Sequence, residues 1–505
     1  MLVSNLKLAL KRYKWFLLIL GVLILAAVLR GLEIYTGNYV FLFDQGAFYL
    51  QVKRIVVERK PMLISEAYTP LPGFFQGPYF IYLLALPFLF LGGNPYWGMV
   101  VMFIIGLMAV LASYFLVKNL FTPLLAVFVA FIFAVYSPAI AASRMIWPPH
   151  IIYLLMPFYI FSLVKLFQND QRFLFWAFLF ASFISSFEIA AGAALYFPIV
   201  FYVLLIGRKM INFKGVVLAV MGAIFPLVPQ ILFNFRHENI MLKGILSLLK
   251  GEVEAGTEKM DWRTTFFSHL QVFKENFVAL FPQNELAWTG LFIFLAGLIL
   301  FLFIKGNLSK KEKSFLFILV SFPLLVFSQL LFYRYILWSW YFVELQVVYI
   351  FLIGFLLAKL FRGKTKWLSL VAVLILLIKT FSMIHFMYTK EIYDFGGTAK
   401  VRGKLEAIDY IYQDAKGEEF NVLVFTPPIY DYPYRYLLSW YGEKKYGFVP
   451  EDRKEGLLYL WIEPDPTKPW TYQGWLETVV REGKIVKEEK LPSGFIIQKR
   501  YVEEK

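Results

Sequence analysis

Long apolar segments constrain this chain more than any other feature. A helix needs about 20 mainly apolar residues to cross the hydrocarbon core of a bilayer. Charged residues make up only 17% of the chain, whereas soluble domains contain about 25%. We therefore predict a polytopic α-helical membrane protein. The eleven candidate spans, several of them short, are 15–31, 97–117, 122–140, 150–166, 173–187, 190–206, 215–234, 288–304, 315–332, 341–358 and 367–386.

Lysine and arginine predict the orientation of the spans, because cytoplasmic loops carry an excess of both. Lys7, Lys11, Arg12 and Lys14 precede the first apolar segment, and alternate loops are basic again, most clearly at 359–366. This places the N-terminus inside the cell and the tail outside. We expect a multi-pass protein of the cytoplasmic membrane, whose net charge of +15 needs no nucleic-acid partner to explain it.

The apolar segment GPYFIYLLALPFLFLGG (77–93) is left out of this count. It is short and carries Pro78 and Pro87, and counting it as a span would place the later lysine clusters outside. We interpret it as a re-entrant or surface-lying helix. A tilted span is the alternative.

The predicted outer side contains two long loops and a tail. The first outer loop, 32–95, includes a helix with an apolar face and a charged face, which is typical of a helix lying in the membrane interface. The other long loop is 235–287. In the tail, FNVLVFT and LLYLWIE are typical of buried strands, and KIVKEEKLPSGFIIQKRYV is typical of a hairpin. We predict a transmembrane domain, 1–387, followed by a small extracytoplasmic α/β domain, 388–505.

Ionisable residues near a membrane are costly and are usually functional. Those that the spans leave unexplained all fall on the predicted outer side: Asp44, Glu66, Arg144, His150, Glu188, Arg236, His237, Arg334 and Glu344. Simpler interpretations stay open for several of them. Asp44 would suit the N-cap of the interfacial helix, and the arginines would suit membrane anchors. Glu344 lies inside a span, so we expect a cationic partner, either Arg334 or Arg236.

Carboxylates and arginines on one side of a membrane favour one kind of chemistry. A carboxylate can abstract a proton, and arginines can hold a phosphate. The sequence has no Gly-rich phosphate loop, no HExxH motif, no cluster of carboxylates at ligand spacing and no cysteine. These features favour transfer from a lipid phosphate donor to an acceptor outside. We expect no cofactor and no metal site, with a divalent metal as the alternative.

Four short motifs in the predicted outer segments carry a resemblance to a known family. They are PGFFQGPYFIYLL in the first loop, SRMIWPPH in the second, NFRHENIMLKGIL, and YRYLLSWYGEKKYG in the tail. With an acid directly after the first span, they resemble the polytopic lipid-phosphate-sugar glycosyltransferases of the GT-C fold. The similarity covers most of residues 1–400 and is nearest to family 39, which includes protein O-mannosyltransferases and aminoarabinose transferases.

The resemblance implies an inverting transfer from a polyprenyl-phosphate sugar, with Asp44 as the general base. It implies that Arg236, His237, Arg334 and Arg144 bind the donor phosphate or lipid. The residues that would contact sugar or acceptor are Glu66, Gln76, His150, Glu188, Tyr341 and Glu344. The acceptor is a glycan, a lipid or a protein.

The chain also departs from the family pattern. The family often has a second acid beside the first, where Gln45 stands here, and often has His where Gln76 stands. These departures leave the sugar and the acceptor open. The alternative functions are a polysaccharide ligase or phosphate-group transferase that uses lipid-linked donors, a transporter or flippase, and a scaffold without catalysis.

Overall fold

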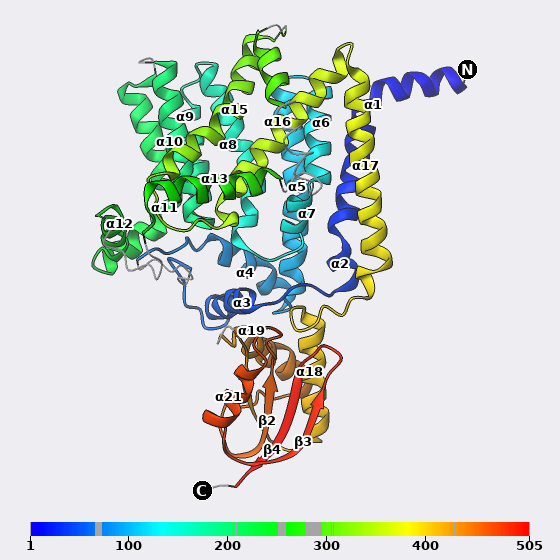
Figure 1. Cartoon of the computed structure of the whole chain (residues 1–505), viewed down its shortest axis with the longest axis vertical. Helices are drawn as coiled ribbons and strands as arrows, with labels where there is room; N and C mark the ends of the chain where they lie inside the picture. The colour runs from blue at the N-terminus through cyan, green and yellow to red at the C-terminus, as the bar shows by residue number, and fades with distance from the viewer. Residues whose placement is uncertain are drawn as a thin grey trace.

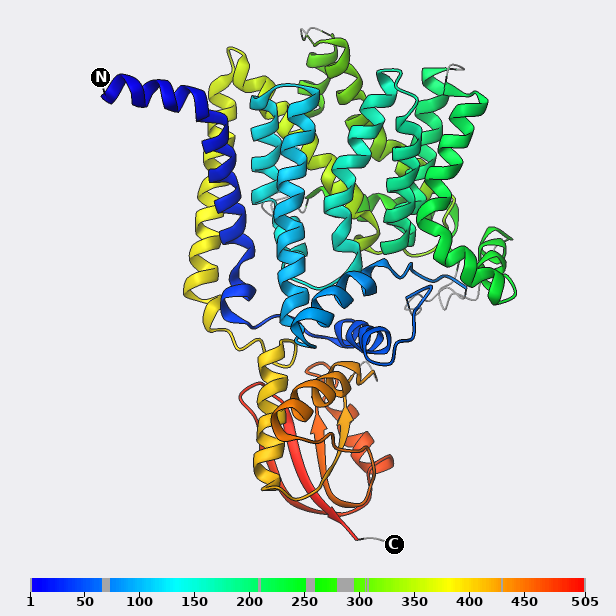
Figure 2. The same cartoon turned by 180° about the vertical axis from the view of Figure 1, so that it is seen from behind.

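Most of the protein forms an upright bundle of helices, with a smaller lobe at one end (Figures 1 and 2). The computed structural model describes residues 2–65, 73–207, 210–250, 259–278, 295–304, 306, 308–427 and 430–503. Within these residues, eight helices are long and apolar enough to cross a membrane. They are α1 (Leu2–Arg30), α5 (Tyr96–Leu120), α8 (Ile152–Phe167), α10 (Ile189–Ile206), α11 (Phe213–Arg236), α15 (Lys310–Leu330), α16 (Val343–Arg362) and α17 (Lys366–Thr389). The prediction of a multi-pass helical membrane protein is confirmed.

Shorter helices complete the bundle. α8 reaches its length of 20 residues only with the preceding 3-10 turn, Pro148–Ile151, whereas the apolar helices of 10 to 17 residues in all are α4 (Tyr79–Leu91), α6 (Pro123–Val135), α9 (Phe173–Phe187) and Leu295–Ile304. The others are α2 (Leu32–Thr36), α3 (Phe43–Val56), α7 (Ser137–Ala142), α12 (Ile240–Lys250) and α13 (Trp262–Val278). The chain starts at the end of the bundle opposite the lobe (Figure 1), as an odd number of crossings requires. The number of eleven spans stays a prediction.

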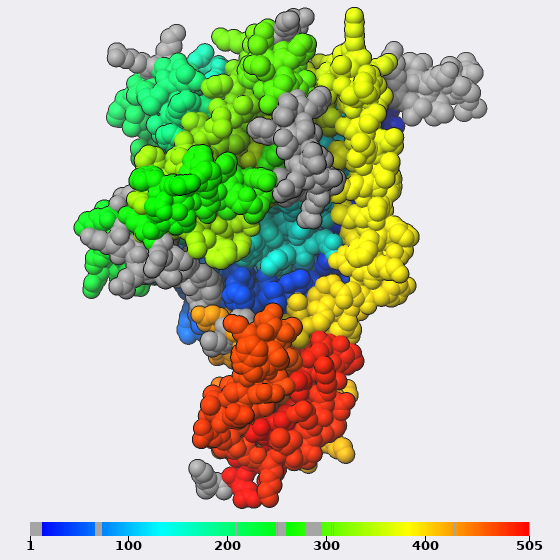
Figure 3. Space-filling model, viewed as in Figure 1, coloured from blue at the N-terminus to red at the C-terminus, as the bar shows by residue number. Residues whose placement is uncertain are grey.

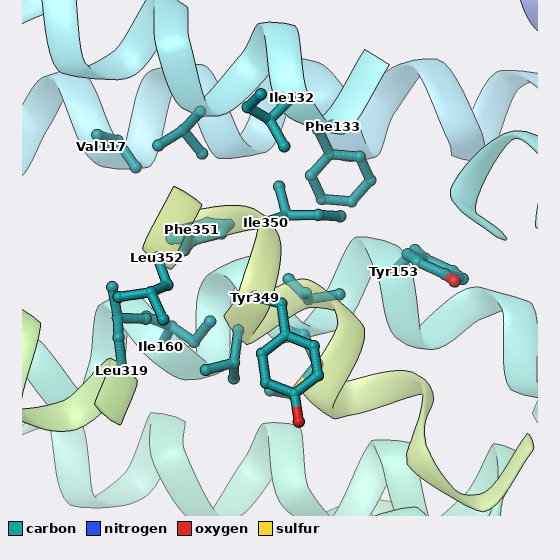
Figure 4. Close-up of a cluster of buried hydrophobic side chains, with 14 of the residues drawn as sticks. Val117, Ile132, Phe133, Tyr153, Ile160, Leu319, Tyr349, Ile350, Phe351 and Leu352 are labelled. Carbon is teal, nitrogen blue, oxygen red and sulfur yellow. The ribbon is translucent and has the colours of Figure 1, made fainter. Parts of the chain in front are cut away.

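The centre of the bundle is α16, which is buried along most of its length. Figure 4 shows its residues Tyr349 to Leu352 packed among side chains of α6, α8 and α15. A Cβ on Gly354 would lie 2.7 Å from the Val129 Cα, so α16 and α6 cross at backbone contact. Small residues allow such close helix crossings in membranes, where dispersion contacts replace the hydrophobic driving force.

A buried arginine links α1 to the end of α6. The Arg30 side chain is fully buried, and its Nη1 donates to the Ala134 carbonyl at 2.7 Å and its Nη2 to the Phe133 carbonyl at 3.0 Å. Its Nε donates to Ser143 Oγ at 3.1 Å, just after α7. The last carbonyls of a helix need such donors. Arg30 thereby fixes where α6 ends and where the 143–151 segment begins.

Helices α3 and α4 lie at the end of the bundle, between it and the C-terminal lobe (Figure 1). This arrangement agrees with an interfacial helix in the first loop and with a surface-lying helix at 77–93. Figure 3 shows the blue surface of this first loop directly above the orange surface of the lobe.

The lobe is a small α/β domain, so the fold-class prediction is confirmed. Its four strands are in the order β1-β2-β4-β3, with β1 and β2 parallel and the other pairs antiparallel. The two strands and the hairpin lie where the sequence predicts them, with β2 buried and β1 mostly half-buried. The strands are β1 (Asn421–Phe425), β2 (Gly456–Ile462), β3 (Lys484–Lys490) and β4 (Ile496–Val502), and the helices are α18 (Val401–Ala415), α19 (Tyr432–Leu437), α20 (Glu443–Tyr446) and α21 (Trp470–Thr478).

The lobe and the first loop share one hydrophobic core, which includes Phe41 and Tyr49 from the loop and Tyr436 from α19. The Tyr49 and Tyr436 rings lie 5.1 Å apart, and the Tyr436 hydroxyl donates to the Gly93 carbonyl. At the contact of α3 with α19, a Cβ on Gly46 would lie 2.2 Å from the backbone nitrogen of Pro433. Only glycine fits this contact without a backbone shift.

We predict that Gly46→Ala destabilises the whole protein. The added methyl group must push α3 and α19 apart, which costs about 1–3 kcal/mol as overpacking does. The measurement is thermal unfolding in detergent, followed separately by tryptophan fluorescence and by proteolysis of the lobe.

The matched control is Gly474→Ala in α21, where a Cβ would meet no atom within 4 Å. We expect this variant to unfold at the wild-type temperature or slightly above it. Equal stability of the two variants would show that the α3–α19 contact is not tight.

Candidate functional site

Asp44 lies in the first turn of α3 but does not cap it. The N-cap residue is Leu42, whose backbone N–H donates to Gln45 Oε1 at 2.8 Å. The N-cap interpretation of Asp44 is therefore wrong, because α3 begins at Phe43 and Asp44 is already its second residue. A carboxylate in the first turn is still favoured by the helix dipole.

Gln45 also fixes α3 to the bundle. Its side chain is fully buried, and its Nε2 donates to the Ile146 carbonyl at 2.9 Å. One side-chain amide thus accepts a hydrogen bond from the start of α3 and donates one to the 143–151 segment. A carboxylate at this position could accept the first bond but could not donate the second.

Trp147, which directly follows Ile146, contacts the carboxylate of Asp44. Burial raises the pKa of Asp44 to about 6, and the hydrogen bond from the Trp147 side chain opposes part of that rise. Asp44 is therefore ionised near neutral pH and has enough affinity for a proton to act as a base.

Aromatic rings connect Trp147 to the segment between α15 and α16. The Trp147 ring lies 5.2 Å from the His150 ring and 6.0 Å from the Trp340 ring. Trp340 in turn stacks on Trp338, with ring centroids 4.9 Å apart. These two tryptophans are partly exposed, and the next residue, Tyr341, lines a cavity.

This cavity has a volume of about 720 Å³ and lies among α10, the 329–341 segment and the residues just before α13. Its lining is mainly apolar and aromatic, from residues such as Ala193, Trp262, Phe332 and Tyr341. The charged residues that line it are Glu188, Lys259 and Arg334. The cavity can hold an apolar chain with an anionic group at its basic part.

Arg334 is the best-placed cation in this lining. Its Nε donates to the Met260 carbonyl at 2.7 Å, and its guanidinium lies 4.8 Å from the centre of the Trp262 ring. These contacts fix the side chain but use one of its five N–H donors. No described residue accepts a hydrogen bond from the other four in this structure, and they suit a phosphate.

Glu188 is the acid of the cavity, and only 8% of it is exposed. It caps α10, since its Oε1 accepts a hydrogen bond from the Ala190 N–H at 3.4 Å. Burial raises the pKa of Glu188 to about 7. It is a second carboxyl group that can exchange a proton near neutral pH.

Arg144 is occupied by carboxylates. It makes two hydrogen bonds to Glu33, at 2.6 and 2.7 Å, and one to Glu391 at 2.5 Å. These ion pairs connect α2 to the segment after α17. They favour a structural role for Arg144 over phosphate binding.

Arg236 and His237 lie at the exposed end of α11 and are not part of the cavity lining. The imidazole of His237 stacks on Phe233 with the ring centroids 3.9 Å apart. The structure therefore separates these two residues from Arg334 and does not bring all the predicted phosphate ligands together.

Glu344 lacks the cationic partner that the sequence predicts. Its side chain is fully buried in α16, and both carboxyl oxygens lack a hydrogen-bond partner among the described residues. The expected ion pair with Arg334 or Arg236 is wrong, because Arg334 bonds to Met260 and Arg236 lies at the surface.

Two further predicted residues lie in the first loop. Gln76 is half-buried, and its backbone carbonyl accepts from the Ser65 N–H at 2.9 Å. Glu66 lies outside the described residues. Among the described residues, no three His, Asp or Glu side chains form a group that could hold a metal ion.

Sequence reasoning missed Lys259, Trp262 and Trp147 as site residues. The first two lie in the long loop 235–287, where no periodic pattern marks them. Trp147 was part of the quoted motif SRMIWPPH, but only the fold shows that it reaches Asp44.

Comparisons with known proteins find likenesses among solved structures. No family model and no curated protein matches the chain. A solved structure matches it over 96% of this chain and 98% of the other, with a TM-score of 0.55 and 11% identity: ArnT from Cupriavidus metallidurans bound to undecaprenyl phosphate. The chain has a GT-C-like fold. At this identity the likeness concerns the fold alone.

We predict that Gln45→Glu, which would place two acids side by side at positions 44 and 45, destabilises the protein. The new carboxylate would be buried facing the Ile146 carbonyl without a proton to donate, which costs about 1–3 kcal/mol. Thermal unfolding at pH 7 measures this effect.

The control for this variant is Gln473→Glu, on the exposed side of α21, which should unfold like the wild type. A Gln45→Glu protein as stable as the wild type would contradict the role of Gln45 as a bridge to Ile146.

Proposed function

We propose that this protein transfers a sugar from a polyprenyl-phosphate-linked donor to an acceptor on the outer side of the membrane. The observation that carries the proposal is the cavity, which is apolar along its walls and carries Arg334 and Lys259. A polyprenyl chain needs apolar walls, and its phosphate needs cations.

Asp44 supplies the base in this proposal. It removes the proton from the acceptor hydroxyl or amine, and the freed lone pair attacks the anomeric carbon from the face opposite the phosphate. The bond between that carbon and the phosphate oxygen breaks, and the configuration at the anomeric carbon inverts. Arg334 and Lys259 stabilise the negative charge on the departing polyprenyl phosphate.

The aromatic rings between Asp44 and the cavity are suited to binding the sugar. Trp147 and Trp340 lie between Asp44 and Tyr341 of the cavity lining. Sugars stack on such rings through their C–H faces, so a sugar bound here would have its anomeric carbon between the base and the phosphate. Family 39 membership is part of the same proposal.

We predict that Asp44→Asn lowers transfer at least about 100-fold, because Asn keeps the size of Asp but cannot accept the proton. Transfer is measured in reconstituted membranes with radiolabelled polyprenyl-phosphate sugars and a lipid extract as acceptor. In the wild type, kcat/KM should rise with pH through about 6, because only ionised Asp44 is a base.

The control is Asp170→Asn in the α8–α9 loop, which should transfer at the wild-type rate. A rising limb near pH 7 that disappears in Glu188→Gln but persists in Asp44→Asn would identify Glu188 as the base instead.

We predict that Arg334→Ala weakens use of the donor by about 10- to 100-fold, since a hydrogen bond to a charged group contributes about 1.5–3 kcal/mol. The KM for the donor measures this loss. Arg236→Ala is the matched control, because Arg236 lies outside the cavity lining, and its KM should stay within about twofold. The reverse order of effects would place the phosphate at α11.

A further inference from the structure

A second, polar groove lies between α3 and the C-terminal lobe. It has a volume of about 820 Å³. One wall is a single face of α3, with Ala47, Leu50 and Lys53, and the other walls are α19, β1 and the 449–453 segment. Because α3 lies between the bundle and the lobe (Figure 1), the groove opens on the side of α3 that faces away from the bundle.

A β-sheet edge that is only partly paired borders this groove, since Asn421 of the edge strand forms a parallel bridge with Glu451. β1 is the edge strand. The backbone N–H and carbonyl groups of Asn421, Leu423 and Phe425 face β2. Val422 points away from β2, since its N–H donates to the Glu451 carbonyl at 2.8 Å. Residues two apart in a strand face the same way. The N–H and carbonyl of Val424 therefore face the groove, where no described backbone group pairs with them.

Both signs of charge line the groove. Lys53 and Arg54 come from α3, and Arg435 comes from α19. The 449–453 segment adds Glu451 and Asp452, of which Glu451 pairs with Arg453 of the same segment, and Glu58 follows α3. An anionic lipid headgroup would meet these acids, whereas a polypeptide of mixed charge would be complementary to both walls.

The groove leads to the candidate base. Ala47 lies one helical turn after Asp44 on α3. Phe43 stacks on Tyr430 at 6.1 Å between ring centroids, and Tyr430 stacks on Tyr432 of the groove at 5.5 Å. β1 runs parallel to β2, whose arrow points toward the bundle (Figure 1). An extended chain along β1 would thus be directed at the start of α3.

We propose that this groove binds the acceptor, and that the acceptor is a polypeptide segment in extended conformation. Its backbone pairs with β1 at Val424, as in other strand-addition modes, and a Ser or Thr hydroxyl reaches Asp44. The hydroxyl oxygen bonds to the anomeric carbon, its proton passes to Asp44, and the bond from that carbon to phosphate breaks. This inference rests on the proposed function for its chemistry, but the binding can be measured without a donor.

The test uses the full chain in lipid nanodiscs and four fluorescein-labelled, end-capped twelve-residue peptides. In these peptides Thr alternates with Val, with Lys, with Glu, or with Lys and Glu in turn. Fluorescence anisotropy gives the Kd. We expect at least one peptide to bind, and the Lys/Glu peptide to bind most tightly. The same peptide with N-methylated backbone amides should bind about tenfold more weakly.

Two variants locate the binding. Val424→Pro removes the open N–H without touching the ladder to β2, and it should weaken binding about tenfold. Its control is Val486→Pro at the bulge of β3, the opposite edge strand, which should bind like the wild type. Leu50→Trp, which fills the groove from α3, should also weaken binding, whereas Val57→Trp, outside the groove lining, should not.

The outcomes separate this inference from the proposed function. Failure of all four peptides to bind below 1 mM, or binding of a soluble oligosaccharide in their place, overturns the inference. Equal effects of the Val424 and Val486 variants overturn it as well. Binding that depends on Val424 supports it even if no polyprenyl-phosphate sugar is transferred in the same nanodiscs, an outcome that would overturn the proposed function alone.

Discussion

A buried cation, with no acid paired to it among the described residues, supports the arrangement of the candidate site. A charge inside a protein is costly unless hydrogen bonds compensate it, and Arg30 is compensated by two carbonyls of α6 and by Ser143. These bonds fix the start of the 143–151 segment. Three residues further on, the Ile146 carbonyl accepts a hydrogen bond from Gln45, and Trp147 reaches Asp44. A continuous series of polar contacts thus runs from the first span to the carboxylate.

The polar residues at this end of the bundle divide into two groups by what they bind. Arg30 and Arg144 have all their strong contacts inside the protein and act as connectors between helices. Arg334 and Lys259 face a cavity with donors to spare, and the raised pKa values of Asp44 and Glu188 place both carboxyls near the protonation range that proton transfer requires. Burial alone does not separate these groups, since Glu344 is buried and its carboxyl oxygens have no hydrogen-bond partner among the described residues. The two groups differ in whether the side chain points toward another part of the protein or into the cavity.

The spans, the interfacial helix and the strands of the lobe were predictable, because each has a hydrophobic period within one short segment. Asp44 was singled out from sequence as an acid in the first outer loop, and its role as the base stays a prediction. The partners were not predictable. Arg334 bonds to Met260, which lies in a loop without a pattern, and Arg144 pairs with Glu391 across 247 positions of sequence. Such pairings depend on how helices cross, which residue spacing does not encode. The role of Gln45 was likewise hidden, because a departure from a family motif does not say what replaces it.

The contact of Gly46 with Pro433 has a consequence for how the protein is made. The ribosome releases α3 soon after the first span, but α19 follows only after every helix of the bundle has been synthesised. Until then the Gly46 face of α3 has no partner, and the groove beside Asp44 has only one wall. The lobe side of this groove is therefore assembled last, and a chain that is still being inserted into the membrane lacks it.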